Sequence, residues 1–248
     1  ESDESTQKSV FDVIRIPERR DSLLQALDTY RRRIQALEDT AALSRDLHAR
    51  LFAPVAPYVR GSRRLAIVPH GALHYLSFAS LSDGREAVVD RFALFYLPSA
   101  SVYRYTRERR RAAAEGPVRA LAIGNPDLGN PNLDLPFAEK EAERMVWDFP
   151  EATTLTGERA TRDWVEENAA RYSIVHIASH GEFDSLNPLY SALLLAPGER
   201  YEDGRLSVRD VLRLTLNADL VTLSACESGL GRLSTGDDQV GLSRAFLY

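Results

Sequence analysis

A cysteine and a histidine each follow an apolar segment, and these two residue types can together perform thiol chemistry. Cys226 comes directly after DLVTLSA (219–225), and His180 comes directly after SIVHIAS (173–179). A free thiol has a pKa of about 8.5 and is only a few per cent thiolate at pH 7, so it needs a base or a lowered pKa to act as a nucleophile. Imidazole has a pKa suited to protonating the leaving nitrogen of an amide. If the two residues meet, they form the minimum pair for nucleophilic catalysis, whereas a buried core cysteine and a capping histidine are the plainer alternative.

Neighbouring residues would complete such a site. A developing oxyanion needs backbone donors, and the N–H groups of Gly181 and Cys226 are the natural candidates, because glycine lets a carbonyl approach the backbone closely. Ser224 lies two residues before Cys226, on the same side of an extended chain, and could line a substrate pocket. Acidic residues near the two elements would select a basic substrate side chain by charge pairing, unless they are only solvated loop charges: Glu182, Glu227, Asp237 and Asp238.

The elements that must position these residues alternate between two types. Short apolar segments, bounded by Pro, Gly, Asn or Asp, predict strands at 65–68, 93–97, 120–124, 173–179, 191–196 and 219–225. Helices are predicted between them at 136–149, 161–172 and 207–214, with Pro136 in a first turn, Thr161 as an N-cap and Ser207–Asp210 at capping-box spacing. Strands that alternate with helices form βαβ units, so the predicted fold class is α/β with a mostly parallel sheet flanked by helices. In such sheets ligands bind outside the carboxyl ends of the strands, where His180 and Cys226 would both emerge.

The N-terminal part differs from the rest. Residues 1–17 are acidic and rich in serine, which predicts a frayed end, and residues 18–60 contain helices with an amphipathic stripe. These helices either pack on the sheet or lead in from a preceding helical module. Residues 61–248 are predicted to form the sheet-containing domain.

The composition of the chain argues against several classes of partner and ligand. The 248 residues carry a net charge of −5, which argues against a direct nucleic-acid partner, and no apolar stretch approaches the length of a membrane span. The single cysteine permits no internal disulfide, which favours a reducing, cytoplasmic setting. Lysine occurs only at positions 8 and 140 among 31 basic residues, which hints at a GC-rich bacterial genome. No cofactor or metal is expected, because His70 and His74 lack a third ligand nearby and His176 lies four residues from His180 in a strand, where such spacing is too long.

Two long segments resemble a known family. VHIASHGEFDSLNPLYSALLLA and DGRLSVRDVLRLTLNADLVTLSACESGLG resemble the CHAT domain, a caspase-like cysteine peptidase family, and the likeness extends upstream to about residue 40. It implies a caspase-hemoglobinase fold, His180 as the catalytic histidine, Cys226 as the nucleophile and Gly181 in the oxyanion hole. Members usually continue with further elements, so the resemblance also implies a domain that is incomplete at Tyr248.

The resemblance implies a cysteine endopeptidase that cleaves a protein or peptide substrate and is activated by a partner protein or helical-repeat module. Two other functions remain open. The chain could be a catalytically incompetent fragment or interaction module on the same fold, or a thiol hydrolase or transferase that acts on a small molecule. A binding module needs neither His180 nor Cys226, so the presence of both favours the peptidase.

Overall fold

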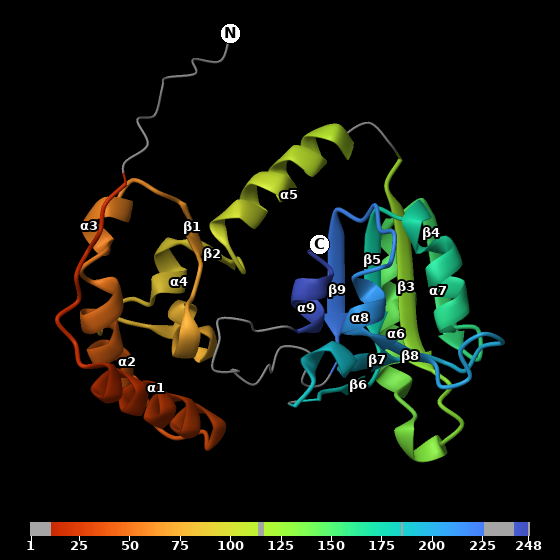
Figure 1. Ribbon diagram of the computed structural model, residues 1–248, viewed down its shortest axis with the longest axis horizontal. Coiled ribbons are helices and arrows are strands. Elements are labelled where there is room, and N and C mark those ends of the chain that lie inside the picture. Colours follow the sequence, from red (N-terminus) through yellow and green to blue (C-terminus); the bar gives the residue numbers. More distant parts are fainter. Residues whose placement is uncertain (1–10, 114–116, 185, 226–240, 248) are drawn as a thin grey trace, which may run out of the picture. The chain divides into compact units, whose positions relative to one another are not determined.

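The computed structural model describes residues 11–113, 117–184, 186–225 and 241–247 (Figure 1). The chain divides into two compact units, Glu1–Leu97 and Pro98–Tyr248. In the described part of the chain, no helix is both long enough and apolar enough to cross a bilayer.

The first unit is mostly helical. Its elements are α1 (Arg20–Gln35), α2 (Ala41–Leu47), the π-helix η1 (His48–Phe52), α3 (Ala56–Val59), β1 (Arg64–Ile67), the 3₁₀ helices η2 (Gly71–Tyr75) and η3 (Phe78–Ser80), α4 (Val88–Arg91) and β2 (Ala93–Tyr96). The strands β1 and β2 pair in parallel. The amphipathic stripe of α1 buries Leu27 and Tyr30 in a core that also contains Leu47 and Phe52. Burial of this apolar face, rather than helix propensity, holds the short helices in place.

The second unit contains the longer elements. They are α5 (Ala100–Ala113), β3 (Arg119–Pro126), η4 (Pro131–Leu133), α6 (Pro136–Met145), η5 (Val146–Asp148), β4 (Glu151–Gly157), α7 (Arg162–Asn168), η6 (Ala169–Arg171), β5 (Ile174–Ala178), β6 (Gly181–Glu182), η7 (Pro188–Tyr190), β7 (Ala192–Leu194), β8 (Arg205–Ser207), α8 (Val208–Val211), β9 (Leu220–Ser224) and α9 (Leu242–Ala245). Within the described residues, the main sheet has the order β4-β3-β5-β9 with all neighbours parallel, and β6-β7-β8 form a small antiparallel sheet. The predicted α/β class with a parallel sheet flanked by helices is therefore confirmed.

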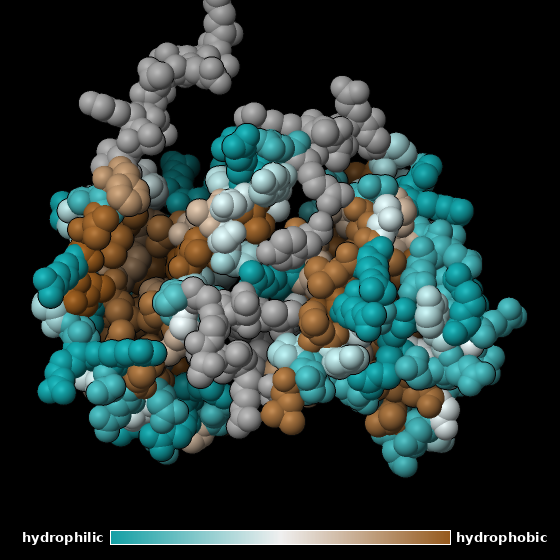
Figure 2. Space-filling view, in the orientation of Figure 1, coloured by the Kyte–Doolittle hydropathy of each residue, from teal (hydrophilic) through white to brown (hydrophobic). Residues whose placement is uncertain are grey.

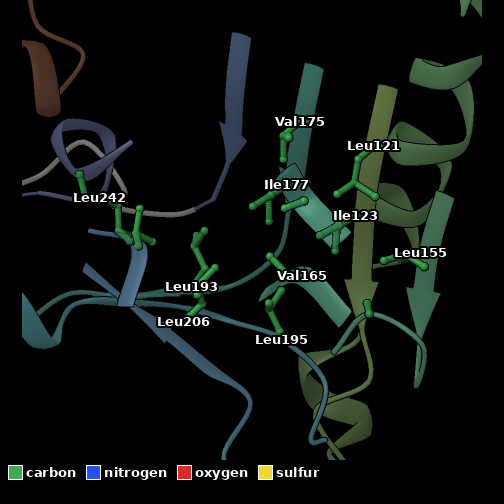
Figure 3. Packing of buried hydrophobic residues seen from close by; sticks show 14 of the residues in the cluster. Leu121, Ile123, Leu155, Val165, Val175, Ile177, Leu193, Leu195, Leu206 and Leu242 are labelled. Carbon is green, nitrogen blue, oxygen red and sulfur yellow. The ribbon is translucent and has the colours of Figure 1, made fainter. Parts of the chain in front are cut away.

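The two faces of the main sheet differ in character. One face supplies Leu121, Ile123, Val175 and Ile177 to a core shared with α7, α8 and the small sheet (Figure 3). On the other face, β3 presents small residues to α6. At Gly124 an added Cβ would lie 2.4 Å from the Ala138 carbonyl oxygen and 2.6 Å from Ala142 Cβ, so α6 approaches β3 closely at this point.

Capping explains where several helices begin. Thr161 accepts a hydrogen bond from the Trp164 N–H, and Ser207 and Asp210 form a reciprocal capping box, as the sequence predicts.

Charged side chains cover the outer surface of α7, which is largely hydrophilic in Figure 2.

The sequence analysis predicts no strand at Glu151–Gly157, and this is wrong: the segment forms β4, at one end of the described sheet. Only Leu155 of this strand is buried, so the segment has no apolar stretch by which it could be recognised. The boundary predicted at residue 60, between the N-terminal helices and the sheet-containing domain, stays a prediction.

Candidate functional site

The site lies at the carboxyl end of β5, next to the carboxyl end of β9. These strands are parallel neighbours, and the last paired residues are Ala178 and Ser224. Beyond them the Ser179 N–H still donates to the Ser224 carbonyl, at 3.3 Å. His180 follows at once, half-buried, and enters the small sheet through the hydrogen bond from the Leu194 N–H to its own carbonyl, at 2.9 Å. The predicted placement of His180 at this edge agrees with the geometry.

A backbone carbonyl orients the His180 ring. Nε2 of His180 lies 2.9 Å from the carbonyl oxygen of Leu133. A carbonyl can only accept, so Nε2 must carry the proton that it donates. In the neutral ring this leaves Nδ1 unprotonated and able to exchange a proton with a reacting group.

The loop that carries Leu133 is held by Asn125, at the end of β3. Asn125 is buried and has a left-handed backbone, with φ of 51°. Its Nδ2 donates to Asp134 Oδ1 at 2.7 Å and to Glu139 Oε2 at 3.3 Å, and its Oδ1 accepts from the Leu135 N–H at 2.7 Å. These bonds hold the chain directly after Leu133, whose carbonyl contacts His180, and they tie it to the end of β3 and to the first turn of α6.

Gly181 begins β6 and faces Leu193 of β7. Because the Leu194 N–H donates to the His180 carbonyl, Gly181 and Leu193 form a non-hydrogen-bonded pair of the antiparallel ladder. The alternation of such a ladder directs the Gly181 N–H away from β7. This orientation is compatible with a donor to an oxyanion.

Glu182 is engaged by a neighbouring strand. Its carboxylate forms a close ion pair with Arg205 of β8, whose guanidinium also donates to the Tyr190 carbonyl at 3.2 Å. The Glu182 carboxylate thus links β6 to β8 across the small sheet, which competes with the predicted role in binding a basic substrate group.

A polar cluster lies on the α6 side of β5 and β9. Nδ1 of His176 is 2.6 Å from the Thr222 hydroxyl oxygen, and Nε2 is 3.2 Å from Glu141 Oε1, close enough for an ion pair although out of line for a hydrogen bond. The other oxygen of Glu141 accepts from the Ser224 hydroxyl at 3.2 Å. Burial lowers the pKa of His176, and the nearby Glu141 carboxylate opposes this effect. His176 therefore packs between strand and helix, as a supporting residue rather than a ligand.

Four of the predicted site residues lie outside the described residues: Cys226, Glu227, Asp237 and Asp238. Ser224, the nearest described neighbour of Cys226 among the predicted set, is exposed and has Glu141 as its partner. The described residues contain no group of three His, Cys, Asp or Glu side chains that could hold a metal ion.

Sequence reasoning missed three contributors: the Leu133 carbonyl, Asn125 and Glu141. A backbone carbonyl carries no sequence signal. The Gly124-Asn125-Pro126 sequence at the end of β3 does mark an irregular position, where the pairing with β4 shifts register, and asparagine tolerates a left-handed conformation better than most residues. Glu141 looks like any exposed helix carboxylate until α6 is placed against β5 and β9.

Comparison with known proteins assigns the family. A family model described as the CHAT domain matches residues 41–248, and a search among curated proteins finds no match. The chain belongs to the CHAT domain family, whose fold is caspase-like, and the sheet order and flanking helices agree with that fold.

Proposed function

We propose that the protein is a caspase-like cysteine endopeptidase, in which Cys226 is the nucleophile and His180 is the acid–base group. Membership of a caspase-like peptidase family supports this proposal. The proposed substrate is a protein or peptide, and a partner protein or sensor module is proposed to activate the enzyme.

The strand register is the observation that carries the proposal. Paired residues of β5 and β9 are 46 positions apart in sequence, as His176 and Thr222 are. His180 and Cys226 have this same offset, and each follows the last paired residue of its strand by two positions. Neighbouring strands lie about 5 Å apart, so a chain that continues in register would bring the two residues within reach of one scissile bond.

In the proposed reaction the Cys226 thiol passes its proton to the unprotonated Nδ1 of His180, the resulting thiolate forms a bond to the carbonyl carbon of the scissile amide, and the carbonyl electron pair moves to oxygen. The Gly181 N–H stabilises this oxyanion. The proton held at His180 Nδ1 passes to the amide nitrogen as the C–N bond breaks, which releases an amine and leaves a thioester. Water then attacks the thioester, its proton returns through His180 to the sulfur, and a carboxylic acid leaves. The Leu133 carbonyl would keep the ring oriented by accepting from Nε2.

We propose one serine and four acidic residues as candidates for lining the substrate pocket. Glu182 would have to leave Arg205 to bind a basic group, which makes it the weakest of the predicted acidic residues. Ser224 is proposed to line the pocket beside Cys226, with Glu141 behind it. Glu227, Asp237 and Asp238 are proposed to border the substrate because they follow the nucleophile in sequence.

The test is a cleavage screen of the protein against proteome-derived peptides, with and without candidate activators. Cys226→Ala and His180→Ala should each abolish cleavage, a loss of at least about 1,000-fold. His70→Ala, at an exposed histidine in the other unit, is the matched control and should retain activity. Because the chain has one cysteine, iodoacetamide at neutral pH reports on Cys226 alone. Undiminished cleavage by His180→Ala would rule out the dyad, and an inert thiol with no cleavage of any peptide would favour the non-enzymatic interaction module.

A further inference from the structure

The outer face of α6 carries two large aromatic side chains that the fold leaves in solvent. Phe137 is 81% exposed and Trp147, in the adjoining η5, is 75% exposed. The opposite face of the helix packs on the sheet through Ala142, which is fully buried. Single exposed apolar residues are common and need no explanation. Two exposed aromatic rings on the same side of the continuous segment formed by α6 and η5 suggest a surface that binds another molecule.

Two cations lie between these rings and contact them. Lys140 Nζ is 5.5 Å from the centroid of the Phe137 ring, and Arg144 Cζ is 5.8 Å from the centroid of the Trp147 ring. Such cation–π contacts restrain both partners, which reduces the entropy lost when another molecule binds. We call Phe137, Lys140, Arg144 and Trp147 the α6 stripe.

The acidic residues of α6 mostly point elsewhere. Glu139 accepts from Asn125, and Glu141 contacts Ser224 and His176 on the sheet side. Glu143 follows Lys140 by three residues and Asp148 directly follows Trp147, and both carboxylates are exposed at the border of the stripe. The stripe itself therefore carries two cations and two aromatic rings, in a chain with a net charge of −5.

The spacing of the stripe suits one kind of partner. Its members follow one another at three, four and three residues, which is the repeat that a second helix packs against. The stripe spans about 15 Å of helix, with one aromatic ring at each end and the two cations between the rings. Lys140 and Arg144 require carboxylates opposite them, since unpaired cations would otherwise be desolvated.

We propose that the α6 stripe docks an amphipathic, acidic helix of a partner protein, with apolar residues on the two rings and Glu or Asp against Lys140 and Arg144. The footprint is small, so the contact is weak by itself and adds to other contacts of the same partner. Nucleic acid fits less well, because the stripe offers two cations and has Glu143 on its border. This interaction does not depend on the peptidase activity.

The proposal is tested with two synthetic 21-residue helices that have Leu at every a and d position of the heptad and either Glu or Lys at every e and g position. Binding to the full chain is followed by fluorescence anisotropy of a label on the peptide at low and high salt. The Glu peptide should bind at least about tenfold more tightly than the Lys peptide, and the preference should weaken as salt rises.

Charge-reversal variants test whether the preference for the Glu peptide comes from the cations of the α6 stripe. Lys140→Glu/Arg144→Glu should invert the preference between the two peptides, whereas Arg104→Glu/Arg107→Glu on α5 changes the total charge equally and should not. Phe137→Ser/Trp147→Ser should weaken binding of the Glu peptide at least about tenfold. All four positions of the stripe are exposed, and circular dichroism checks that each variant is folded.

Three outcomes would overturn the proposal. The first is equal affinity for both peptides, or no effect of either stripe variant. The second is tighter binding of a single-stranded oligonucleotide than of the Glu peptide. The third is self-association of the chain that the Phe137→Ser/Trp147→Ser variant abolishes, because the occupant would then be a second copy.

Discussion

Replacing Asn125 by glycine removes the side chain that braces the Leu133 loop while leaving the backbone conformation accessible. Glycine adopts a φ of 51° without strain, so the substitution separates the hydrogen bonds from the backbone requirement. Lost are the short bond to the Asp134 carboxylate, the short bond from the Leu135 N–H and the longer contact with Glu139.

The size of the effect follows from these three bonds. A bond to a charged group contributes about 1.5–3 kcal/mol, and a bond to a backbone amide about 0.5–1.5 kcal/mol. The Glu139 contact is long, and Asp134 is exposed and can rehydrate, so both belong at the low end of their ranges. We expect Asn125→Gly to lower the free energy of unfolding of the Pro98–Tyr248 unit by about 3.5–4.5 kcal/mol.

Tryptophan fluorescence in urea is the direct assay. The chain has two tryptophans, and both Trp147 and Trp164 lie in the Pro98–Tyr248 unit, so the transition reports that unit alone. Asn125→Asp is the informative companion variant: it keeps the acceptor for the Leu135 N–H but places a third carboxylate beside Asp134 and Glu139. It should be the less stable of the two variants at pH 7 and should recover as the pH falls and the carboxylates become protonated.

A loss below about 0.5 kcal/mol for Asn125→Gly would refute the bracing role, since surface substitutions of no consequence fall in that range. If the proposed dyad operates, cleavage should also fall under conditions where the variant is fully folded, because His180 loses its fixed acceptor. Cleavage at the wild-type rate by a folded but destabilised Asn125→Gly protein would show that catalysis by His180 does not require the bracing of the Leu133 loop.

Two further changes test the packing of α6 against the sheet. Gly124→Ala should destabilise the same unit by about 2–3 kcal/mol, because the new methyl group would overlap the Ala138 carbonyl; Gly241→Ala, where the space is open, should change urea stability little. His176 has a lowered pKa in the folded chain, so its contribution is intact above about pH 6.5, the unfolded value, and is lost as the pH falls through the folded pKa. The free energy of unfolding should therefore drop less between pH 7.5 and 5 in His176→Gln than in the wild type, and equal slopes would contradict this.

The sequence by itself determined the elements whose signals are local. Apolar segments marked the strands β3, β5 and β9. The side chains of Thr161 and Ser207 marked helix starts, because apolar patterning and capping depend on residues a few positions apart. The sequence did not predict β4, because this strand lies at the end of the described sheet and has only one buried residue, so it lacks such a pattern.

Tertiary structure alone decided which of these elements meet. β5 and β9 pair at an offset of 46 positions, and no local pattern encodes this strand order or its register. The contact of His180 with the Leu133 carbonyl joins residues 47 positions apart, and Ser224 reaches a carboxylate 83 positions away. The ion pair that occupies Glu182 likewise depends on how β6, β7 and β8 fold together. Residue types indicate what chemistry a chain can perform, but the packing of strands and helices decides which groups are close enough to perform it.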